Sequence, residues 1–294
     1  MRGKGYRRVS DASYAYLLII PLIIFELGLT VYPLVYSFWT SLHNTNLAAN
    51  TDKYVGLANY IHVFTSSATL NSLQLSLVFM ITVVISSVLL GIGIALLLNE
   101  EFVGRGLVRA LVLLPWAIAE YSCAIMWSGI YNQSYGFLNG LLMQLGIIRE
   151  YTSFVTPAYA IYAVAIAYTW HYTPLGAFFF LGSLQAVPQD LYSQAKIDGA
   201  KVFRRFWVVT RPFMRHSFMI VAILSVVQAL QALDLVFVMT FGGPGVATQV
   251  LPYLVYRETF ATMSLGLGAS LAWTLSALII ALTTVLFVLL TRRR

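Results

Sequence analysis

Long runs of apolar side chains recur along the chain and leave few positions for charged residues. About 20 apolar residues can cross the hydrocarbon core of a bilayer as one helix. The runs predict six such helices, at about residues 14–42, 72–98, 107–130, 157–187, 218–241 and 264–290. Because lipid cannot pair backbone amides, we expect an all-α, polytopic membrane protein with a single domain over residues 1–294. Only 10% of the residues are charged, which excludes an ordinary soluble enzyme.

The cationic residues fall mainly on one side of these predicted helices. Fifteen of the 18 Lys and Arg residues lie near the two ends of the chain, before the third helix and in the loop at residues 188–217. Lys53, Arg149 and Arg257 remain for the other side. Loops rich in Lys and Arg stay in the cytoplasm, so both termini and the 188–217 loop are predicted to be cytoplasmic. Membrane orientation therefore explains the net charge of +7 without a nucleic acid partner.

The 188–217 loop is the longest charged interruption in the chain. Its pattern predicts two short helices, the first starting at Pro188 with Asp190 as its N-cap. Gly199 is expected to end this helix, because glycine tolerates a positive φ. A second, amphipathic helix is expected to close at Pro212. A basic amphipathic helix of this kind could simply bind anionic lipid head groups.

A family resemblance appears in the same loop. The run Tyr192–Ala200, YSQAKIDGA, followed by Phe206 and Arg211-Pro212, resembles the cytoplasmic "EAA" loop of permease subunits in binding-protein-dependent ABC importers. Four further segments resemble the carbohydrate, maltose-type branch of these permeases: VGLANY at 55–60, GRG at 104–106, LP at 114–115 and TFGGPGVAT at 240–248. The resemblance covers nearly the whole chain and implies the type I ABC importer permease fold.

The resemblance also implies partners and contacts. They are a second homologous permease, an ATPase dimer that binds ATP and Mg, and an extracytoplasmic sugar-binding protein. The ATPase would contact a set of loop residues: Asp190, Leu191, Tyr192, Ser193, Ala195, Lys196, Asp198, Gly199 and Ala200. Ser193 departs from the pattern, since the family usually has a glutamate there that pairs with the ATPase.

The chain itself is not expected to be an enzyme or to hold a cofactor. It contains no G-x-x-x-x-G-K-[ST] phosphate loop, so ATP hydrolysis is expected on the separate subunit. Cys and His residues are not spaced as metal ligands, and Cys123 is the only cysteine. No serine lies in the context of a hydrolase nucleophile.

Three carboxylates, Glu26, Glu120 and Asp234, fall inside predicted spans, where a charge costs at least about 2.5 kcal/mol. Gln231 and Asp234 have i, i+3 spacing, which predicts one polar stripe together with Gln228. Such groups could bind the hydroxyls of a sugar, or they could join neighbouring helices by hydrogen bonds. In the resembling permeases this span lines the central cavity, which favours a substrate contact. Glu26 is instead expected to make a structural or assembly contact.

Aromatic residues near two prolines extend the predicted substrate pathway. Tyr121 lies beside Glu120, and Tyr168 and His171 precede Pro174 in the fourth span, where we expect a break or strong kink. Aromatic rings stack on the apolar faces of sugars, although Tyr is also typical of the membrane interface. A single His in such a helix is more often a buried structural residue than a proton relay. In the second span, Gly91 and Gly93 are expected to form a surface for close helix packing.

The scarcity of Lys and Arg in the predicted spans indicates which class of substrate to expect. Arg105 and Arg109 lead into the third span, and the spans otherwise contain no Lys or Arg. A site for phosphate would be expected to offer a cation, so a neutral sugar or polyol is favoured. Alternatives are a permease of the same superfamily for glycerol phosphate or a polyamine. A less favoured alternative is a proton-coupled secondary transporter that uses Glu26, Glu120 and Asp234.

Overall fold

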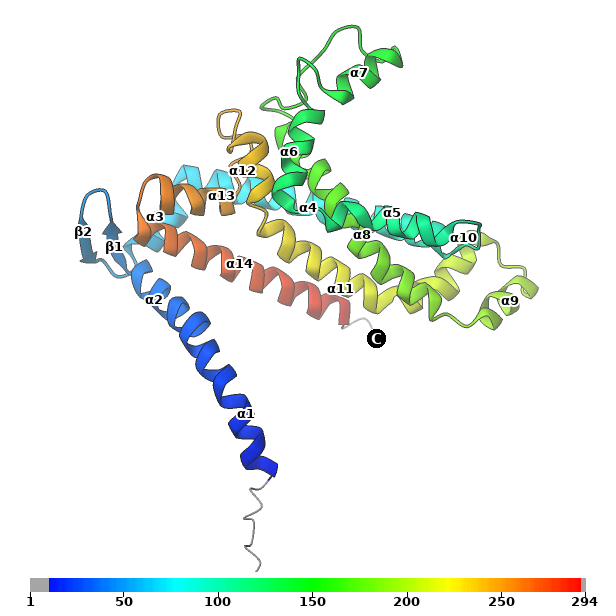
Figure 1. The fold of residues 1–294 in the computed structure, drawn as a ribbon, viewed down its shortest axis with the longest axis horizontal. Helices are drawn as coiled ribbons and strands as arrows, with labels where there is room; N and C mark the ends of the chain where they lie inside the picture. The colour runs from blue at the N-terminus through cyan, green and yellow to red at the C-terminus, as the bar shows by residue number, and fades with distance from the viewer. Residues whose placement is uncertain (1–10, 292–294) are drawn as a thin grey trace, which may run out of the picture.

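The computed structural model describes residues 11–291, and it is almost entirely helical, as predicted (Figure 1). The basic residues 1–10 and 292–294, which contributed to the predicted orientation, lie outside the described residues. The α-helices are α1 Asp11–Glu26, α2 Tyr32–Ser41, α3 Ala58–Thr65, α4 Ser67–Asn99, α5 Arg105–Ala117, α6 Glu120–Ile130, α7 Phe137–Gln144, α8 Ala160–Gln185, α9 Gln189–Ile197, α10 Val202–Arg205, α11 Arg211–Leu230, α12 Asp234–Thr240, α13 Leu251–Tyr256 and α14 Leu265–Thr291. Three π-helical turns, η1 Leu27–Val31, η2 Phe206–Thr210 and η3 Arg257–Ala261, join some of them.

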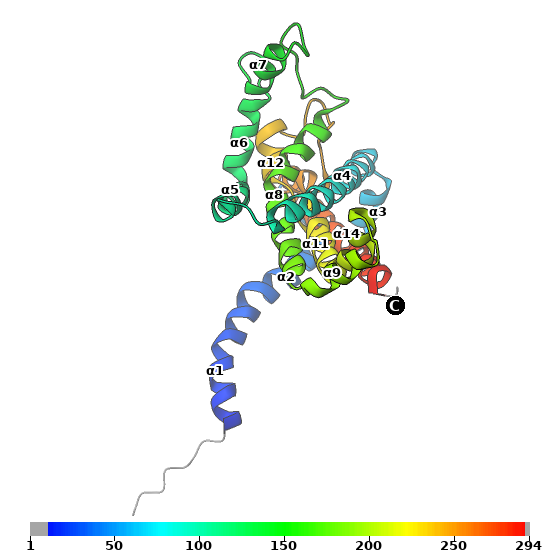
Figure 2. The ribbon, with the colours of Figure 1, turned by 90° about the vertical axis from the view of Figure 1, so that its right-hand side faces the viewer.

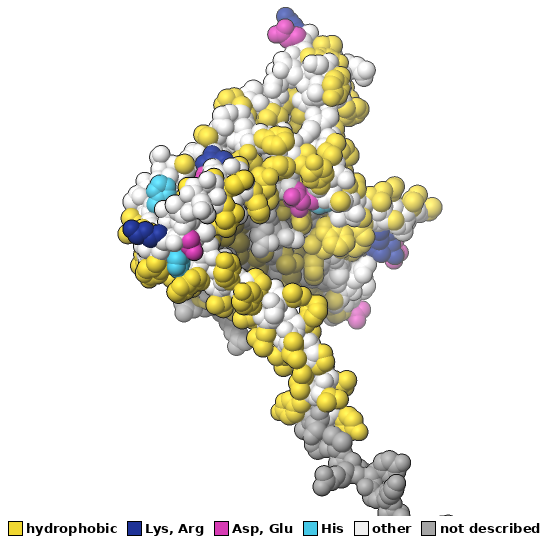
Figure 3. Space-filling view, turned by 60° about the vertical axis from the view of Figure 1, so that its left-hand side comes forward, with side chains coloured by type: hydrophobic (Ala, Val, Ile, Leu, Met, Phe, Trp, Pro, Cys, Tyr) yellow, Lys and Arg dark blue, Asp and Glu magenta, His cyan; other side chains and the backbone are white. Residues whose placement is uncertain are grey.

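The surface is the one expected of a membrane protein. Figure 3 shows hydrophobic side chains over most of the visible face, with acidic and basic groups in a few separate places. Four helical segments are long and apolar enough to cross a bilayer: Tyr16–Ser41, Ser67–Asn99, Val202–Leu230 and Leu265–Thr291. The pair α5 and α6 qualifies as a fifth, but it is bent by 95°. The predicted count of six is not confirmed among the described residues, because the polar and aromatic middle of α8 makes that helix less apolar.

The centre of the molecule is the long contact between α4 and α8, with α11 packed against both. Gly91 makes this contact close, since a Cβ there would lie 3.4 Å from the Ala177 amide nitrogen and 3.5 Å from the Gly176 carbonyl carbon. Nothing lies within 4 Å of the position that a Cβ would take at Gly93, so within the described chain only Gly91 shows the predicted close packing. At Pro174 the expected break is absent, because α8 continues through this residue, and the alternative of a strong kink stays a prediction.

The charged loop and the fifth span differ most from the prediction. The helix does not close at Pro212, which lies in the first turn of α11. The preceding turn η2 is π-helical, with the Arg211 amide bonded to the Phe206 carbonyl, and this widened turn accommodates the residue that lacks an amide hydrogen. At its other end α11 stops at Leu230, and α12 starts only at Asp234. The predicted span 218–241 is therefore broken at residues 231–233.

Helix α1 extends away from the other helices, whereas α2, which continues it through η1, packs against α14 (Figures 1 and 2). None of the most apolar part of Tyr16–Ser41 is buried within this chain. Glu26 lies on this segment and is exposed. The role predicted for Glu26, a contact made in assembly, therefore stays a prediction.

A small β-hairpin joins the first helical segment to the last helix. Strands β1, His43–Asn46, and β2, Thr51–Tyr54, pair antiparallel in a region that was expected to be a polar loop. The Asn46 side-chain amide donates to the Ser264 hydroxyl at 2.9 Å, and the Leu47 amide donates to the Met263 carbonyl at 3.0 Å. These contacts hold the hairpin against the start of α14.

Candidate functional site

Two regions contain the residues that the sequence singled out, and the first is the loop around α9. This helix ends with two nested hydrogen bonds, from the Gly199 amide to the Lys196 carbonyl at 3.0 Å and from the Ala200 amide to the Ala195 carbonyl at 2.9 Å. The pattern is a Schellman motif, which requires a left-handed residue after the helix. Gly199 supplies it with φ of +75°, as predicted. The Asp-Gly-Ala run therefore sets the corner between α9 and α10.

The start of α9 differs from the prediction. Asp190 is not the N-cap, because Pro188 occupies that position and no side chain caps the helix. Asp190 lies in the first turn instead, where its negative charge still interacts favourably with the helix dipole.

The predicted contact residues of the loop are mostly accessible. Leu191, Tyr192, Ala195 and Ala200 are half-buried, and the other members of the set are exposed: Asp190, Ser193, Lys196, Asp198 and Gly199.

Three apolar side chains beside this set were not singled out in the sequence. Ile197, Val202 and Phe203 are 86%, 73% and 74% exposed. Apolar residues inside a charged loop were the available signal, since such patches mark interaction surfaces. They enlarge the candidate docking surface around the corner at Gly199.

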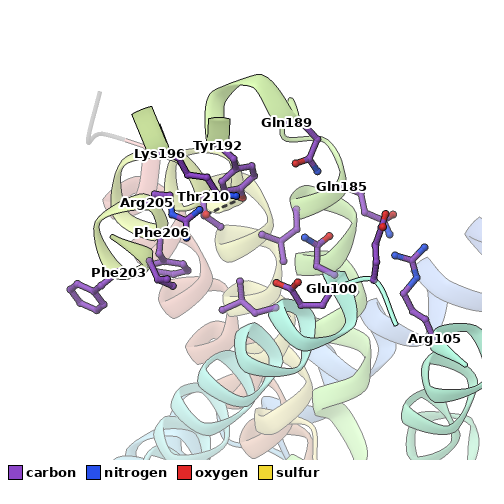
Figure 4. Close-up of a pocket in the computed structure, with 15 residues that line it drawn as sticks. Glu100, Arg105, Gln185, Gln189, Tyr192, Lys196, Phe203, Arg205, Phe206 and Thr210 are labelled. Carbon is purple, nitrogen blue, oxygen red and sulfur yellow. Dashed lines mark hydrogen bonds between the residues drawn. The ribbon is translucent and has the colours of Figure 1, made fainter. Parts of the chain in front are cut away.

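A cavity of about 1240 Å³ adjoins this surface, between α9, α10, η2 and the ends of α4 and α8, and Val202 and Phe203 are among the residues that line it (Figure 4). Tyr192 connects two of its walls, because its hydroxyl lies 3.0 Å from the Thr210 hydroxyl. Glu100 and Arg105 line one part of the cavity, while Lys196 and Arg205 line another. The α9 segment is thus supported from behind mainly through Tyr192.

The second region lies where α6, α8 and α12 meet. Glu120 is the first residue of α6 and Asp234 is the first residue of α12, and these two helices pack against each other. Glu120 is half-buried and Asp234 is exposed, and the packing of α6, α8 and α12 on one another brings these two helix starts into the region of Tyr172 on α8. The helices that carry these groups, α6, α8 and α12, contain no Lys or Arg. The result is an acidic site with a tyrosine beside it.

The structure changes the roles expected for several pathway residues. Gln231 follows the end of α11 and is exposed, so it does not form a continuous helical stripe with Asp234. The predicted i, i+3 stripe is wrong, because the helix is broken between Leu230 and Asp234. Tyr121 follows Glu120 in α6 and is 53% exposed, and within residues 11–291 its side chain makes no hydrogen bond to Glu120 or Asp234. Gln228 is half-buried and lines a small cavity with Tyr172.

Tyr168 and His171 are buried behind the acidic site. Tyr168 is 1% exposed and stacks on Tyr172 with ring centroids 4.6 Å apart. Its hydroxyl donates to the Gln228 carbonyl at 2.7 Å. His171 is 4% exposed, and its Nδ1 donates to the Pro115 carbonyl at 2.7 Å. Neither side chain can therefore form much of an open pathway wall.

Comparison with known proteins supplies the family. Residues 74–294 match the family model described as "Binding-protein-dependent transport system inner membrane component". The trehalose/maltose transport system permease protein MalF of Thermococcus litoralis is 35% identical, over 94% of this chain and 92% of that protein. The sn-glycerol-3-phosphate transport system permease protein UgpA of Agrobacterium fabrum is 29% identical, over 92% of each chain.

A solved structure confirms the fold. A bacterial ABC transporter involved in the import of the acidic polysaccharide alginate contains a chain with a TM-score of 0.82, at 16% identity, over 95% of this chain and 96% of that one. The type I ABC importer permease fold is thus present here. With the family model covering most of its length, this chain belongs to the family of binding-protein-dependent transport system inner membrane components and is a multi-pass membrane permease of an ABC importer.

Proposed function

We propose that this permease is one of two homologous subunits of an ATP-driven importer for neutral sugars, and that Glu120 and Asp234 bind the sugar hydroxyls. The observation that supports this most is the acidic site itself. Two carboxylates on the packed helices α6 and α12, which contain no Lys or Arg, would repel a phosphate or an acidic sugar. Carboxylates accept hydrogen bonds from hydroxyl groups, which suits a polyol.

The relatives support the same choice. The trehalose/maltose permease shares 35% of its residues with this chain over the aligned region, and the glycerol-3-phosphate permease shares 29%. Glycerol phosphate remains the second candidate because of that relative. A stand-alone proton-coupled transporter does not fit a family that depends on a binding protein.

The surface around α9 is the proposed docking site for a separate ATPase dimer. It combines exposed polar residues of the predicted set with the apolar side chains of Ile197, Val202 and Phe203. Ser193 is exposed and donates only to the Gln189 carbonyl, at 3.3 Å, so the charged contact that the family usually makes here would be missing. ATP and Mg would bind to the ATPase, and this chain would carry no cofactor and no catalytic residue.

Transport would follow from two states of the assembly. Closure of the ATPases on ATP would rock the two permeases from an inward-open to an outward-open state. The extracytoplasmic binding protein would deliver its sugar to the outward-open state. The sugar then moves because the two states differ in affinity for it.

Uptake into proteoliposomes that contain both permeases, the ATPase and the sugar-loaded binding protein tests the substrate. We expect ATP-dependent uptake of trehalose or maltose. Asp234→Asn should keep uptake within about threefold, because an amide still bonds to hydroxyls. Asp234→Leu should lower uptake at least about tenfold, the loss of about 1.4 kcal/mol of binding.

Two control substrates make this result decisive. Glycerol 3-phosphate and spermidine are supplied to the same vesicles with and without an excess of sugar. Uptake of either one in preference to the sugars would overturn the proposed substrate class. Equal uptake by wild type and Asp234→Leu would instead show that Asp234 does not contact the sugar.

A further inference from the structure

Two pairs of consecutive helices, α5–α6 and α11–α12, are each separated by a short break, and both breaks share one arrangement. The α5–α6 pair bends by 95° at residues 118–119, and α11 is separated from α12 at residues 231–233. In each case the residue that starts the second helix is an acid, Glu120 in α6 and Asp234 in α12. The positions of the two carboxylates therefore depend on how the two breaks are held.

A break leaves backbone carbonyl groups without their helical partners. The last four carbonyls of a helix have no amide one turn ahead, and inside a membrane an unpaired carbonyl is costly. Pro115 lies in the last turn of α5 and Gln228 lies in the last turn of α11. Each of these carbonyl groups receives a hydrogen bond from a side chain of α8.

Tyr168 forms the bond at the second break. Its hydroxyl donates to the Gln228 carbonyl at 2.7 Å, beside the Gln231 amide, which donates to the same oxygen at 3.1 Å. The Tyr168 ring packs against two other rings. It stacks on Tyr172, and it makes a T-shaped contact with Phe79 in which the ring centroids are 5.4 Å apart. A buried ring that cannot rotate freely thus sets where α11 ends.

His171 forms the bond at the first break. Its Nδ1 lies 2.7 Å from the Pro115 carbonyl, which can only accept, so the proton is on Nδ1. Tyr172 packs edge-on against the His171 ring with centroids 4.9 Å apart. Tyr168 and His171 have i, i+3 spacing, so they project from one side of α8 towards the two breaks.

We infer that Tyr168 and His171 are positioning residues that fix the two helix breaks relative to α8, and with them the positions of Glu120 and Asp234. The inference rests on the proposed binding of sugar by these two carboxylates. It makes α8 the part of the chain that sets sugar selectivity, although its two residues touch no substrate. Loss of either bond would let α6 or α12 shift and would change the spacing of the carboxylates.

The single cysteine gives a test that does not depend on sugar. Cys123 is fully buried on α6, one turn after Glu120, and it is free. In membranes that contain the assembled transporter, a permeant maleimide should label wild-type Cys123 slowly. His171→Phe, which keeps a ring and removes the donor, should raise the labelling rate at least about tenfold. His171→Asn should restore slow labelling, because its amide donates from nearly the place of Nδ1.

Matched substitutions on α8 distinguish the loss of one specific hydrogen bond from a general destabilisation of the helix. Tyr168→Phe removes only the hydroxyl from the second break, and Tyr162→Phe makes the same change at a ring that is 46% exposed on α8. We expect Tyr168→Phe to raise Cys123 labelling, through α12 and its contact with α6, while Tyr162→Phe leaves it at the wild-type rate. Unchanged labelling in both His171→Phe and Tyr168→Phe would overturn the inference.

The second measurement is the selectivity of uptake between two sugars. The ratio of trehalose to maltose uptake should change at least about fivefold in Tyr168→Phe and His171→Phe and return in His171→Asn. A purely structural role would lower both sugars equally and leave the ratio unchanged, which would also overturn the inference. If Asp234→Asn changes the ratio and Tyr168→Phe does not, the positioning role fails and the proposed site stands. Absence of sugar uptake by wild type would mark failure of the proposed function, whatever the labelling shows.

Discussion

Replacing Gly199 with valine should lower ATP-driven uptake at least about tenfold while the chain still inserts into the membrane. Gly199 has φ of +75° and closes α9 through its bond to the Lys196 carbonyl. A residue with a Cβ pays about 1–2 kcal/mol in this conformation, and a β-branched residue pays more. The corner should therefore open, and α9 should turn away from the direction in which it presents its exposed face. The measurement is uptake into proteoliposomes, together with the amount of ATPase that copurifies with the permease.

The control for Gly199→Val is the same change at a second glycine with similar geometry. Gly146 has φ of +70°, nothing lies within 4 Å of the position a Cβ would take, and the residue is in the loop after α7. Gly146→Val imposes comparable backbone strain far from α9 in the sequence, and it should keep uptake within about twofold. Equal losses in the two variants would show that strain on folding, and not the α9 corner, explains the effect. Normal ATPase copurification with Gly199→Val would argue against docking at this loop.

Gly266→Ala should destabilise the folded chain strongly, although it adds a single methyl group. The new Cβ would lie 1.9 Å from the His43 carbonyl oxygen and 3.1 Å from the Thr45 amide nitrogen. Both neighbours are backbone atoms of β1, so no side chain can rotate to make room. The hairpin should be pushed off the start of α14, at a cost of about 1–3 kcal/mol in the free energy of unfolding. Thermal unfolding of the detergent-purified protein should show a lower transition temperature.

Gly93→Ala is the matched control for this second prediction. Gly93 lies inside α4 with nothing within 4 Å of its missing Cβ, and alanine is the better helix former by up to about 1 kcal/mol. The transition temperature of this variant should stay unchanged or rise. A Gly266→Ala protein that unfolds at the wild-type temperature would mean that the hairpin does not pack this closely on α14 in the folded protein.

Several features of the molecule could be predicted from the sequence because they depend on local properties. A helix is the only open structure that pairs its own amides in lipid, so long apolar runs predicted the helical class and most helix positions. The positive φ at Gly199 also followed from a local rule, since the residue after a helix often adopts a left-handed conformation. The close helix packing at Gly91 could also be predicted, because a glycine lets another helix approach closely. None of these conclusions required knowledge of which helices are neighbours.

The tertiary structure alone decided how the candidate substrate site is built. Periodicity placed Gln231 and Asp234 on one helical face, but α11 ends at Leu230, and the break changes the direction of every side chain after it. Tyr168 looked like a pathway residue, yet packing against Phe79 and Tyr172 buries it and turns its hydroxyl towards a backbone carbonyl.

The positions of Glu120 and Asp234 show why the sequence alone could not predict this site. The two residues are far apart in sequence, and they come into one region because α6 and α12 pack together after separate breaks. Local patterns report which side chains suit a helix in lipid. Which helix ends lie together is set by the packing of distant segments and by hydrogen bonds such as those from α8, and no single stretch of sequence contains that information.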